Sequence, residues 1–146
     1  MLITNHVLAG ALIGRAVSRR PAAAFAAGVV SHLLMDSCPH WGSEDLDEFY
    51  RVARCDGCAG LAAMALAAGV APGSSRKAVL AAMVGASIVD ADKPMEYFFG
   101  VNPFPAAVRR FHKRIQREAP HRLPHEIVLA LLLAVVVFSG LGPSRH

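Results

Sequence analysis

Residues 32–41, His-Leu-Leu-Met-Asp-Ser-Cys-Pro-His-Trp, are the most informative segment of this sequence. It ends an apolar segment and carries three potential metal ligands, His32, Asp36 and His40, spaced four residues apart. On a helix, side chains at i and i+4 lie one above the other on the same face, so His32 and Asp36 can point at one ion. Pro39 bends the chain so that His40 can turn back toward that ion. Because the helix dipole disfavours a negative charge near a helix C-terminus, Asp36 indicates a function rather than a contribution to stability.

Around this stretch, the spacing of apolar residues predicts five helices and almost no strand. Cap residues, prolines at first helical positions and glycines after the last turns mark the helix ends. The predicted helices cover residues 4–17, 21–37, 58–70, 76–90 and 126–139, with Thr4 and Asn5 as caps of the first. Residues 106–118 form a further, amphipathic helix, in which Val108, Phe111 and Ile115 recur opposite basic side chains. Such a helix either lies on a membrane interface or packs on the bundle with a solvated outer face.

The expected fold is all-α: one domain, residues 1–146, built as an antiparallel bundle of about five short helices plus the basic amphipathic helix. Hydrophobic residues make up 54% of the chain and charged residues 18%, a balance shifted toward that of membrane proteins. Residues 127–141 carry no charge but are slightly short of the roughly 20 residues of a full span. Helices rich in Ala and Gly pack closely in lipid, although they also build soluble bundles. The composition favours a membrane-embedded bundle.

Short loops make consecutive helices antiparallel neighbours, so alternate helix ends meet at one end of the bundle. This end, called the polar end below, is predicted to hold His6, His32, Asp36, His40, Asp56, Asp90, Asp92, His121 and His125. The opposite end receives Arg15, Arg19, Arg20, Arg76, Lys77 and Arg145, without a carboxylate. Imidazoles and carboxylates without paired thiolates suit a divalent metal, Zn²⁺ first and Mn or Fe as alternatives. The surplus of carboxylates allows one or two ions.

The predicted metal ligands are His6, His32, Asp36, His40 and Asp90. A bound metal lowers the pKa of water to roughly 7 and so supplies a nucleophile. Asp56 is the candidate catalytic group that activates this water, and an N-cap role explains its position about equally well. The chain lacks a Walker loop, a nucleophile elbow and a dinucleotide fingerprint, which argues against the enzyme classes built on them.

The formal net charge of +4 owes most to the basic segment of residues 109–122. Arg109, Arg110, His112 and Lys113 are expected to contact an anionic substrate or anionic membrane lipid. Nucleic-acid binding is disfavoured, because aromatic residues are few and no recognised motif surrounds the basic helix. The alternative to an enzyme is a small membrane protein whose polar end holds a structural metal or a partner. The oligomeric state is not predicted.

Several sequence motifs of this chain resemble those of a small bacterial family, the membrane-bound metal-dependent hydrolases. The shared features are Asn5-His6 followed by a small-residue helix (residues 8–14), the His-x-x-x-Asp helix end with its Pro-His-Trp (residues 32–41), and the apolar run into Asp90-Ala-Asp92. More distantly, His32-x-x-x-Asp36 with a later histidine is similar to the ligand helix of the zinc-dependent phospholipase C and P1 nuclease superfamily, which is also all-helical.

The resemblance implies hydrolysis of a phosphoester, such as a lipid headgroup, at a bacterial inner membrane. The secreted superfamily uses an N-terminal tryptophan as a ligand, whereas the sole tryptophan here is Trp41. Its late His-x-x-x-Glu motif also has no clear counterpart, so a three-metal cluster is not carried over. Most of the 15 Lys and Arg residues fall at the polar end, which the positive-inside rule places in the cytoplasm.

Overall fold

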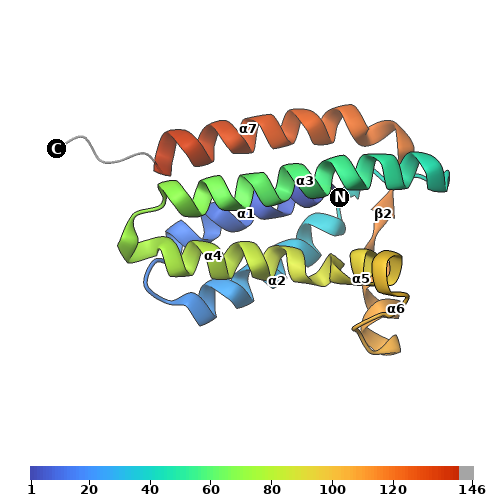
Figure 1. Ribbon diagram of the computed structural model, residues 1–146, viewed down its shortest axis with the longest axis horizontal. Coiled ribbons are helices and arrows are strands. Elements are labelled where there is room, and N and C mark those ends of the chain that lie inside the picture. Colours follow the sequence, from blue (N-terminus) through green and yellow to red (C-terminus); the bar gives the residue numbers. More distant parts are fainter. Residues whose placement is uncertain (142–146) are drawn as a thin grey trace.

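The computed structural model describes residues 1–141 and is almost entirely helical (Figure 1). Its helices are α1 (Ile3–Ala16), α2 (Pro21–Asp36), α3 (Leu46–Val70), α4 (Gly73–Ile88), α5 (Asp92–Phe99), α6 (Ala106–Ile115) and α7 (Leu123–Leu141). Short 3-10 turns, Val89–Ala91 and Pro120–Arg122, precede α5 and α7. Two short strands, β1 (Pro39–His40) and β2 (Arg117–Glu118), pair in parallel. The predicted all-α class is confirmed.

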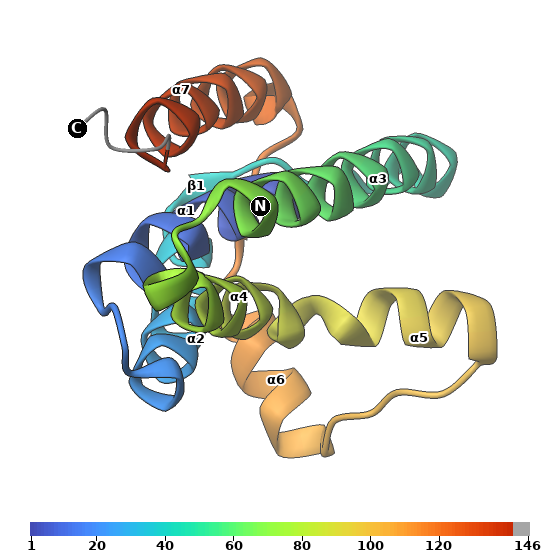
Figure 2. The same ribbon diagram turned by 60° about the vertical axis from the view of Figure 1, so that its left-hand side comes forward.

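The helices of the bundle, α1, α2, α3, α4 and α7, run roughly along the long axis of the molecule in alternating directions (Figure 1). α1 is central and contacts α2, α3, α4 and α7, while α2 packs mainly on α4. The start of α1, the end of α2, the start of α3, the end of α4 and the start of α7 lie at the same end of the bundle, beside α5 and α6 (Figures 1 and 2). The topology therefore forms the polar end that the short loops predict.

Glycines allow α4 to lie directly against the backbones of α1 and α2. A Cβ atom added at Gly14 would lie 2.4 Å from the Cα of Val79, and one at Gly28 would lie 2.2 Å from the carbonyl oxygen of Ala82. A Cβ at Gly85 would lie 2.2 Å from the carbonyl oxygen of Phe25. Since these neighbours are backbone atoms, the helices would have to separate to admit any larger residue.

The ridges that carry these small residues also carry the polar side chains of the polar end. On α1 the ridge of residues 10 and 14 begins at His6, and on α2 the ridge of residues 24 and 28 continues into His32 and Asp36. The α4 ridge of residues 78, 82 and 86 leads to Asp90 in the 3-10 turn. Because residues four apart share a helix face, close packing along the ridges directs all four polar side chains inward.

Three local features differ from the predictions. α3 begins at Leu46, twelve residues earlier than predicted, because the Asp45 side chain accepts hydrogen bonds from the backbone N–H groups of Asp47 and Glu48. The helix α5 is absent from the sequence prediction; it ends at Phe99 and is followed by Gly100, whose φ of +66° suits glycine. The side chains of Thr4 and Asn5 do not cap α1, whose N-cap position is Leu2.

Two helical segments are long and apolar enough to cross a membrane: α3 and residues Pro120–Ser139. Only 11% of the most apolar window of each is buried, so neither is an enclosed core helix. Large apolar side chains are exposed on the outer faces of the bundle: Val30, Leu34, Leu61, Leu66, Val84, Ile88, Leu131, Leu132, Val135 and Val136. Exposed apolar surface spread over several helices is uncommon on soluble monomers.

The glycine contacts predict a position-specific loss of stability. We expect Gly28→Ala and Gly85→Ala to destabilise the fold by about 1–3 kcal/mol, the range for overpacked cores, because the added methyl meets a backbone carbonyl. The matched control is Gly57→Ala in α3, where an added Cβ has nothing within 4 Å. There the higher helix propensity of Ala should leave stability unchanged or raise it by up to about 1 kcal/mol. Thermal unfolding followed by circular dichroism measures the three variants, and equal effects at all three would contradict the packing.

Candidate metal centre

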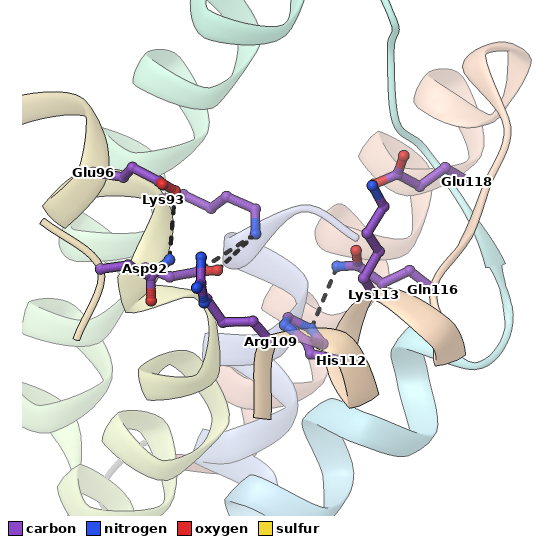
Figure 3. Close-up of a pocket in the computed structure, with 9 residues that line it drawn as sticks. Asp92, Lys93, Glu96, Arg109, His112, Lys113, Gln116 and Glu118 are labelled. Atoms are coloured by element: carbon purple, nitrogen blue, oxygen red, sulfur yellow. Dashed lines mark hydrogen bonds and ion pairs between the residues drawn. The ribbon is translucent and has the colours of Figure 1, made fainter. Parts of the chain in front are cut away.

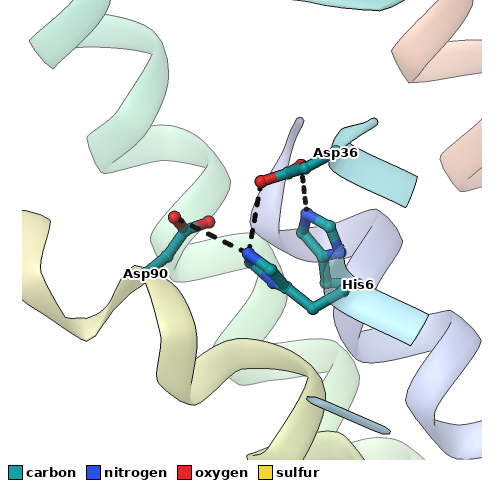
Figure 4. A group of neighbouring side chains, drawn as sticks. His6, Asp36 and Asp90 are labelled. Atoms are coloured by element: carbon teal, nitrogen blue, oxygen red, sulfur yellow. Dashed lines mark hydrogen bonds and ion pairs between the residues drawn. The ribbon is translucent and has the colours of Figure 1, made fainter. Parts of the chain in front are cut away.

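Four side chains from the ends of three helical segments converge at the polar end: His6, His32, Asp36 and Asp90 (Figure 4). Each offers one ligand atom, and these atoms all lie within 4.8 Å of one another. Asp36 lies between the imidazoles, with Oδ1 3.2 Å from His6 Nε2 and Oδ2 3.2 Å from His32 Nε2. The side chains of His6, His32 and Asp36 are fully buried, and that of Asp90 is 18% exposed.

A fifth side chain, His112 from α6, joins this group. Its Nε2 atom lies 3.0 Å from Asp36 Oδ2, 3.2 Å from His32 Nε2 and 3.9 Å from Asp90 Oδ1. His112 is the only buried residue of α6, so the amphipathic helix is fixed to the bundle largely through this imidazole. From the sequence, His112 is expected to contact an anionic substrate or lipid rather than a metal. We define the ligand cluster as His6, His32, Asp36, Asp90 and His112.

The hydrogen bonds of His32 fix the direction of its lone pair. Its Nδ1–H donates to the carbonyl oxygen of Ala86 at 2.7 Å, so Nε2 faces the cluster. Nε2 donates to Asp36 when the ring is protonated and offers its lone pair to a metal when the ring is neutral. Metal-binding histidines are commonly held by such a bond from the second ring nitrogen to a backbone carbonyl. Nε2 of His32 nevertheless lies 3.2 Å from both a carboxylate oxygen and a second imidazole nitrogen. Only a proton or a cation makes these contacts attractive.

The electrostatics of the cluster also favour a cation. Burial opposes ionisation of Asp36, yet hydrogen bonds from His112, His32 and His6 outweigh burial and hold the pKa of Asp36 far below its usual range. Burial lowers the pKa of His6, which favours the neutral ring. Within the described residues Nδ1 of His6 has no hydrogen-bond partner. The cluster therefore combines an ionised buried carboxylate with at least one neutral imidazole.

The spacing of the donor atoms fits a metal of the size of Zn²⁺. In a tetrahedral site with bonds of about 2.0–2.1 Å, ligand atoms lie about 3.3–3.4 Å apart. Each of the three imidazoles lies 3.0–3.2 Å from an Asp36 oxygen, and His32 Nε2 lies 3.2 Å from His112 Nε2. Asp90 Oδ1 lies 3.9–4.0 Å from the Nε2 atoms of His32 and His112. The cluster can therefore hold one divalent ion, and the identity of the metal is left open by this geometry.

Carboxylates from two neighbouring helices hold the start of α1, which carries His6. Asp56 of α3 accepts hydrogen bonds from the backbone N–H groups of Ile3 and Thr4 and from the Thr4 hydroxyl. Glu126 of α7 accepts from the N–H of Leu2 at 3.0 Å and from the amide of Asn5 at 2.8 Å. These acids satisfy the free N–H groups of the first helical turn and complement its dipole.

Two residues predicted to belong to the site lie outside the ligand cluster. His40 is buried in β1, where Nδ1 donates to the Cys38 carbonyl oxygen and Nε2 has no hydrogen-bond partner among residues 1–141. Both carboxylate oxygens of Asp56 accept hydrogen bonds from the first turn of α1. Asp56 therefore has a capping role, as the N-cap interpretation of the sequence suggests, but it caps a neighbouring helix rather than its own. Activation of water by Asp56 stays a prediction.

A cavity of about 490 Å³ lies between α5 and α6 beside the cluster (Figure 3). His112 and Gln116 line it, and both also contact Asp36 Oδ2, at 3.0 and 3.4 Å. The other lining residues are mostly charged: Asp92, Lys93, Glu96, Asn102, Arg109, Lys113 and Glu118. Lys93 is paired with Asp92 at 3.1 Å, whereas Arg109 and Lys113 have no salt-bridge partner within the described part of the chain. Of the predicted anion contacts, Arg110 alone is not part of the lining.

Comparison of the chain with known protein families, with curated proteins and with solved structures gave no significant match.

The cluster predicts that the purified protein binds a divalent ion through Asp36. Asp36→Asn keeps the shape of the side chain but removes its charge, and we expect the affinity for Zn²⁺ to fall more than tenfold, since even loss of a residue that only supports a ligand costs about 10–100-fold. His40→Ala is the matched control and should bind normally. Isothermal titration after metal removal measures both variants, and equal affinity in Asp36→Asn and the unchanged protein would exclude this site.

The position of His112 predicts that this residue binds the metal, although no metal-binding motif surrounds it in the sequence. His112→Gln should weaken Zn²⁺ binding about tenfold or more, because it removes an imidazole from the cluster. Arg110→Gln, two residues earlier on α6, changes an exposed side chain outside the cluster and should have no effect. Competition with a chromophoric chelator compares the two variants, and normal binding by His112→Gln would remove His112 from the ligand set.

Proposed function

We propose that this chain is a membrane-embedded metal-dependent hydrolase that acts on a phosphoester. The observation that carries the proposal is the position of the ligand cluster beside a cavity lined by Arg109 and Lys113, two cations without a salt-bridge partner among residues 1–141. A buried group of imidazoles and carboxylates without thiolates suits a hydrolytic metal, and unpaired cations suit an anionic substrate. The resemblance to membrane-bound metal-dependent hydrolases supports the same chemistry.

The residues of this chain would divide the work between the cluster and the cavity. His6, His32, Asp36, Asp90 and His112 would hold one divalent ion, most simply Zn²⁺, with Mn or Fe as alternatives. When bound, such an ion supplies Lewis-acid chemistry and makes water a nucleophile at neutral pH.

Arg109 and Lys113 would bind the charged oxygens of the substrate and orient its phosphorus toward the cluster. They line the cavity on α6, the helix that also brings His112 to Asp36. One helix would therefore position the anion relative to the metal ligands. Charge-assisted hydrogen bonds of this kind are stronger than neutral ones and can be directed by the fixed helix.

The membrane location is proposed from the outer surface of the bundle. α3 and residues 120–139 are long and apolar enough to span a bilayer and are exposed along most of their length. A lipid headgroup is accordingly the substrate that we favour, because it would reach the polar end without leaving the membrane. The resemblance and the surplus of Lys and Arg at this end favour the bacterial inner membrane with the polar end in the cytoplasm.

A second candidate function is a structural metal site in a membrane protein that has no catalytic activity. Its support is the complete burial of His6, His32 and Asp36, since structural metal sites are closed to water whereas catalytic sites keep an open position. The partly exposed Asp90 and the adjoining cavity favour the hydrolase. Turnover separates the two candidates.

We expect the metal-loaded protein to hydrolyse bis(p-nitrophenyl) phosphate or a phospholipid headgroup ester, to lose activity on chelation, and to regain it when Zn²⁺ or Mn²⁺ is added. Asp36→Asn should be inactive. Lys113→Ala and Arg109→Ala should each raise KM about tenfold, the effect of losing about 1.4 kcal/mol of binding to the anion.

The control for these variants is Arg114→Ala, an exposed change on α6 that does not line the cavity, and it should leave KM unchanged. A folded, metal-loaded protein that turns over none of these phosphoesters would favour the structural metal site instead.

A further inference from the structure

At the polar end, α5 and α6 leave the direction of the other helices. Both lie crosswise to the long axis of the bundle and are joined by a loop, residues 100–105, far from the core (Figures 1 and 2). Each has a single buried residue, Asp92 in α5 and His112 in α6. Nearly all of their surface is therefore unused by the packing of the bundle. We call residues 92–115 the α5–α6 unit.

An unbroken series of aromatic contacts leads from the buried part of the chain to the outer end of α5. Neighbouring ring centroids lie 4.7–6.5 Å apart along the series Trp41, Phe49, Tyr50, Tyr97, Phe98 and Phe99. Trp41 is buried, whereas Phe98 and Phe99 are 67% and 70% exposed. Trp41 and Phe49 are stacked, and the remaining pairs meet edge-on or tilted. The two exposed phenylalanines form an apolar tip at the end of this series.

α6 adds a second exposed apolar edge next to a basic face. Phe111 is 54% exposed and Val108 is 43% exposed. Arg109, Arg110, Lys113 and Arg114 are exposed on the same helix, which contains no acidic residue. A short helix with an apolar edge and a cationic face is typical of helices that lie in the plane of a membrane interface.

The direction of the two helices agrees with that assignment. If α3 and α7 cross the bilayer, helices perpendicular to them lie parallel to its surface, at the depth where the bundle leaves the hydrocarbon. Aromatic side chains are enriched at this depth, and Lys and Arg there attract anionic headgroups. The amphipathic pattern of α6 left two alternatives open, an interfacial helix and a solvated one. The exposed phenylalanines of α5 favour the interfacial one.

We infer that the α5–α6 unit is a membrane-interface surface that binds anionic phospholipid headgroups. Phe98, Phe99 and Phe111 enter the upper acyl region, and the basic residues of α6 contact the headgroup phosphates. The inference rests on the membrane embedding proposed above and is independent of hydrolysis. It also sets the cavity between α5 and α6 at the depth of the headgroups.

The test uses single-tryptophan variants of the full chain reconstituted into lipid nanodiscs. Trp41→Phe removes the native tryptophan. In that background, Phe98→Trp and Phe111→Trp report on the unit, and Leu132→Trp reports on the middle of α7. The nanodiscs contain phosphatidylcholine with or without phosphatidylglycerol, and the acyl chains are brominated either near the headgroup or near their ends.

Leu132→Trp should be quenched most by the deep bromines in both lipids. Phe98→Trp and Phe111→Trp should be quenched by the shallow bromines, and phosphatidylglycerol should increase this quenching and shift the emission to the blue. Arg110→Glu with Arg114→Glu should abolish the effect of phosphatidylglycerol. The matched control, Arg20→Glu with Lys77→Glu at the opposite end, should retain it.

The reporters distinguish failure of this inference from failure of the membrane proposal. If Leu132→Trp is quenched while both reporters on the unit stay unquenched, the unit faces water and the inference is wrong. If Leu132→Trp is itself unquenched, the bundle is not embedded and both proposals fall. Measuring Zn²⁺ binding by each variant confirms that it is folded.

Discussion

The negative charge of Asp36, in a fully buried position, determines how the helix ends are arranged around it. A buried carboxylate is stable only when hydrogen bonds and positive charge compensate for the lost hydration. Here the N-terminal ammonium of Met1 lies 3.2 Å from Asp36 Oδ1, and the amide of Gln116 lies 3.4 Å from Oδ2. The imidazole nitrogens around the carboxylate come from residues 6, 32 and 112, which belong to three helices. Because these groups share one centre, the ends of α1, α2 and α6 must meet around it. The two carboxylate oxygens of Asp36 thus hold together helices that are far apart in the sequence.

Small residues make that meeting possible. Helices bearing larger side chains along the ridges of α1, α2 and α4 would be held too far apart for short side chains such as Asp36 and Asp90 to share a site. The same ridges continue into the ligand residues, so the close packing of the helices also places the ligands. The outer surface has the opposite character: large apolar side chains face outward, and the core is built largely from Ala and Gly. This distribution accounts for both the close-packed interior and the proposed membrane location.

Much of this arrangement could be predicted from the sequence because it depends on local spacing and short loops. His32 and Asp36 are four residues apart, and the up-and-down topology brings residues 6 and 90 to the same end. His112 was missed as a ligand because its position depends on how α5, the following loop and α6 fold back, which no periodicity encodes. The role of Asp56 could not be predicted because it depends on contact with a neighbouring helix. The early start of α3 could not be predicted because it depends on a capping hydrogen bond within an acidic loop.

The most direct test of the central claim is X-ray absorption spectroscopy of the purified, metal-loaded protein at the edge of the bound metal. If the ligand cluster holds the metal, the spectrum shows a coordination shell of nitrogen and oxygen only, with scattering from about three imidazoles, and this signal is lost when Asp36 is replaced by Asn. A folded protein that binds no stoichiometric metal, or a shell that contains sulfur from the cysteines, would contradict it.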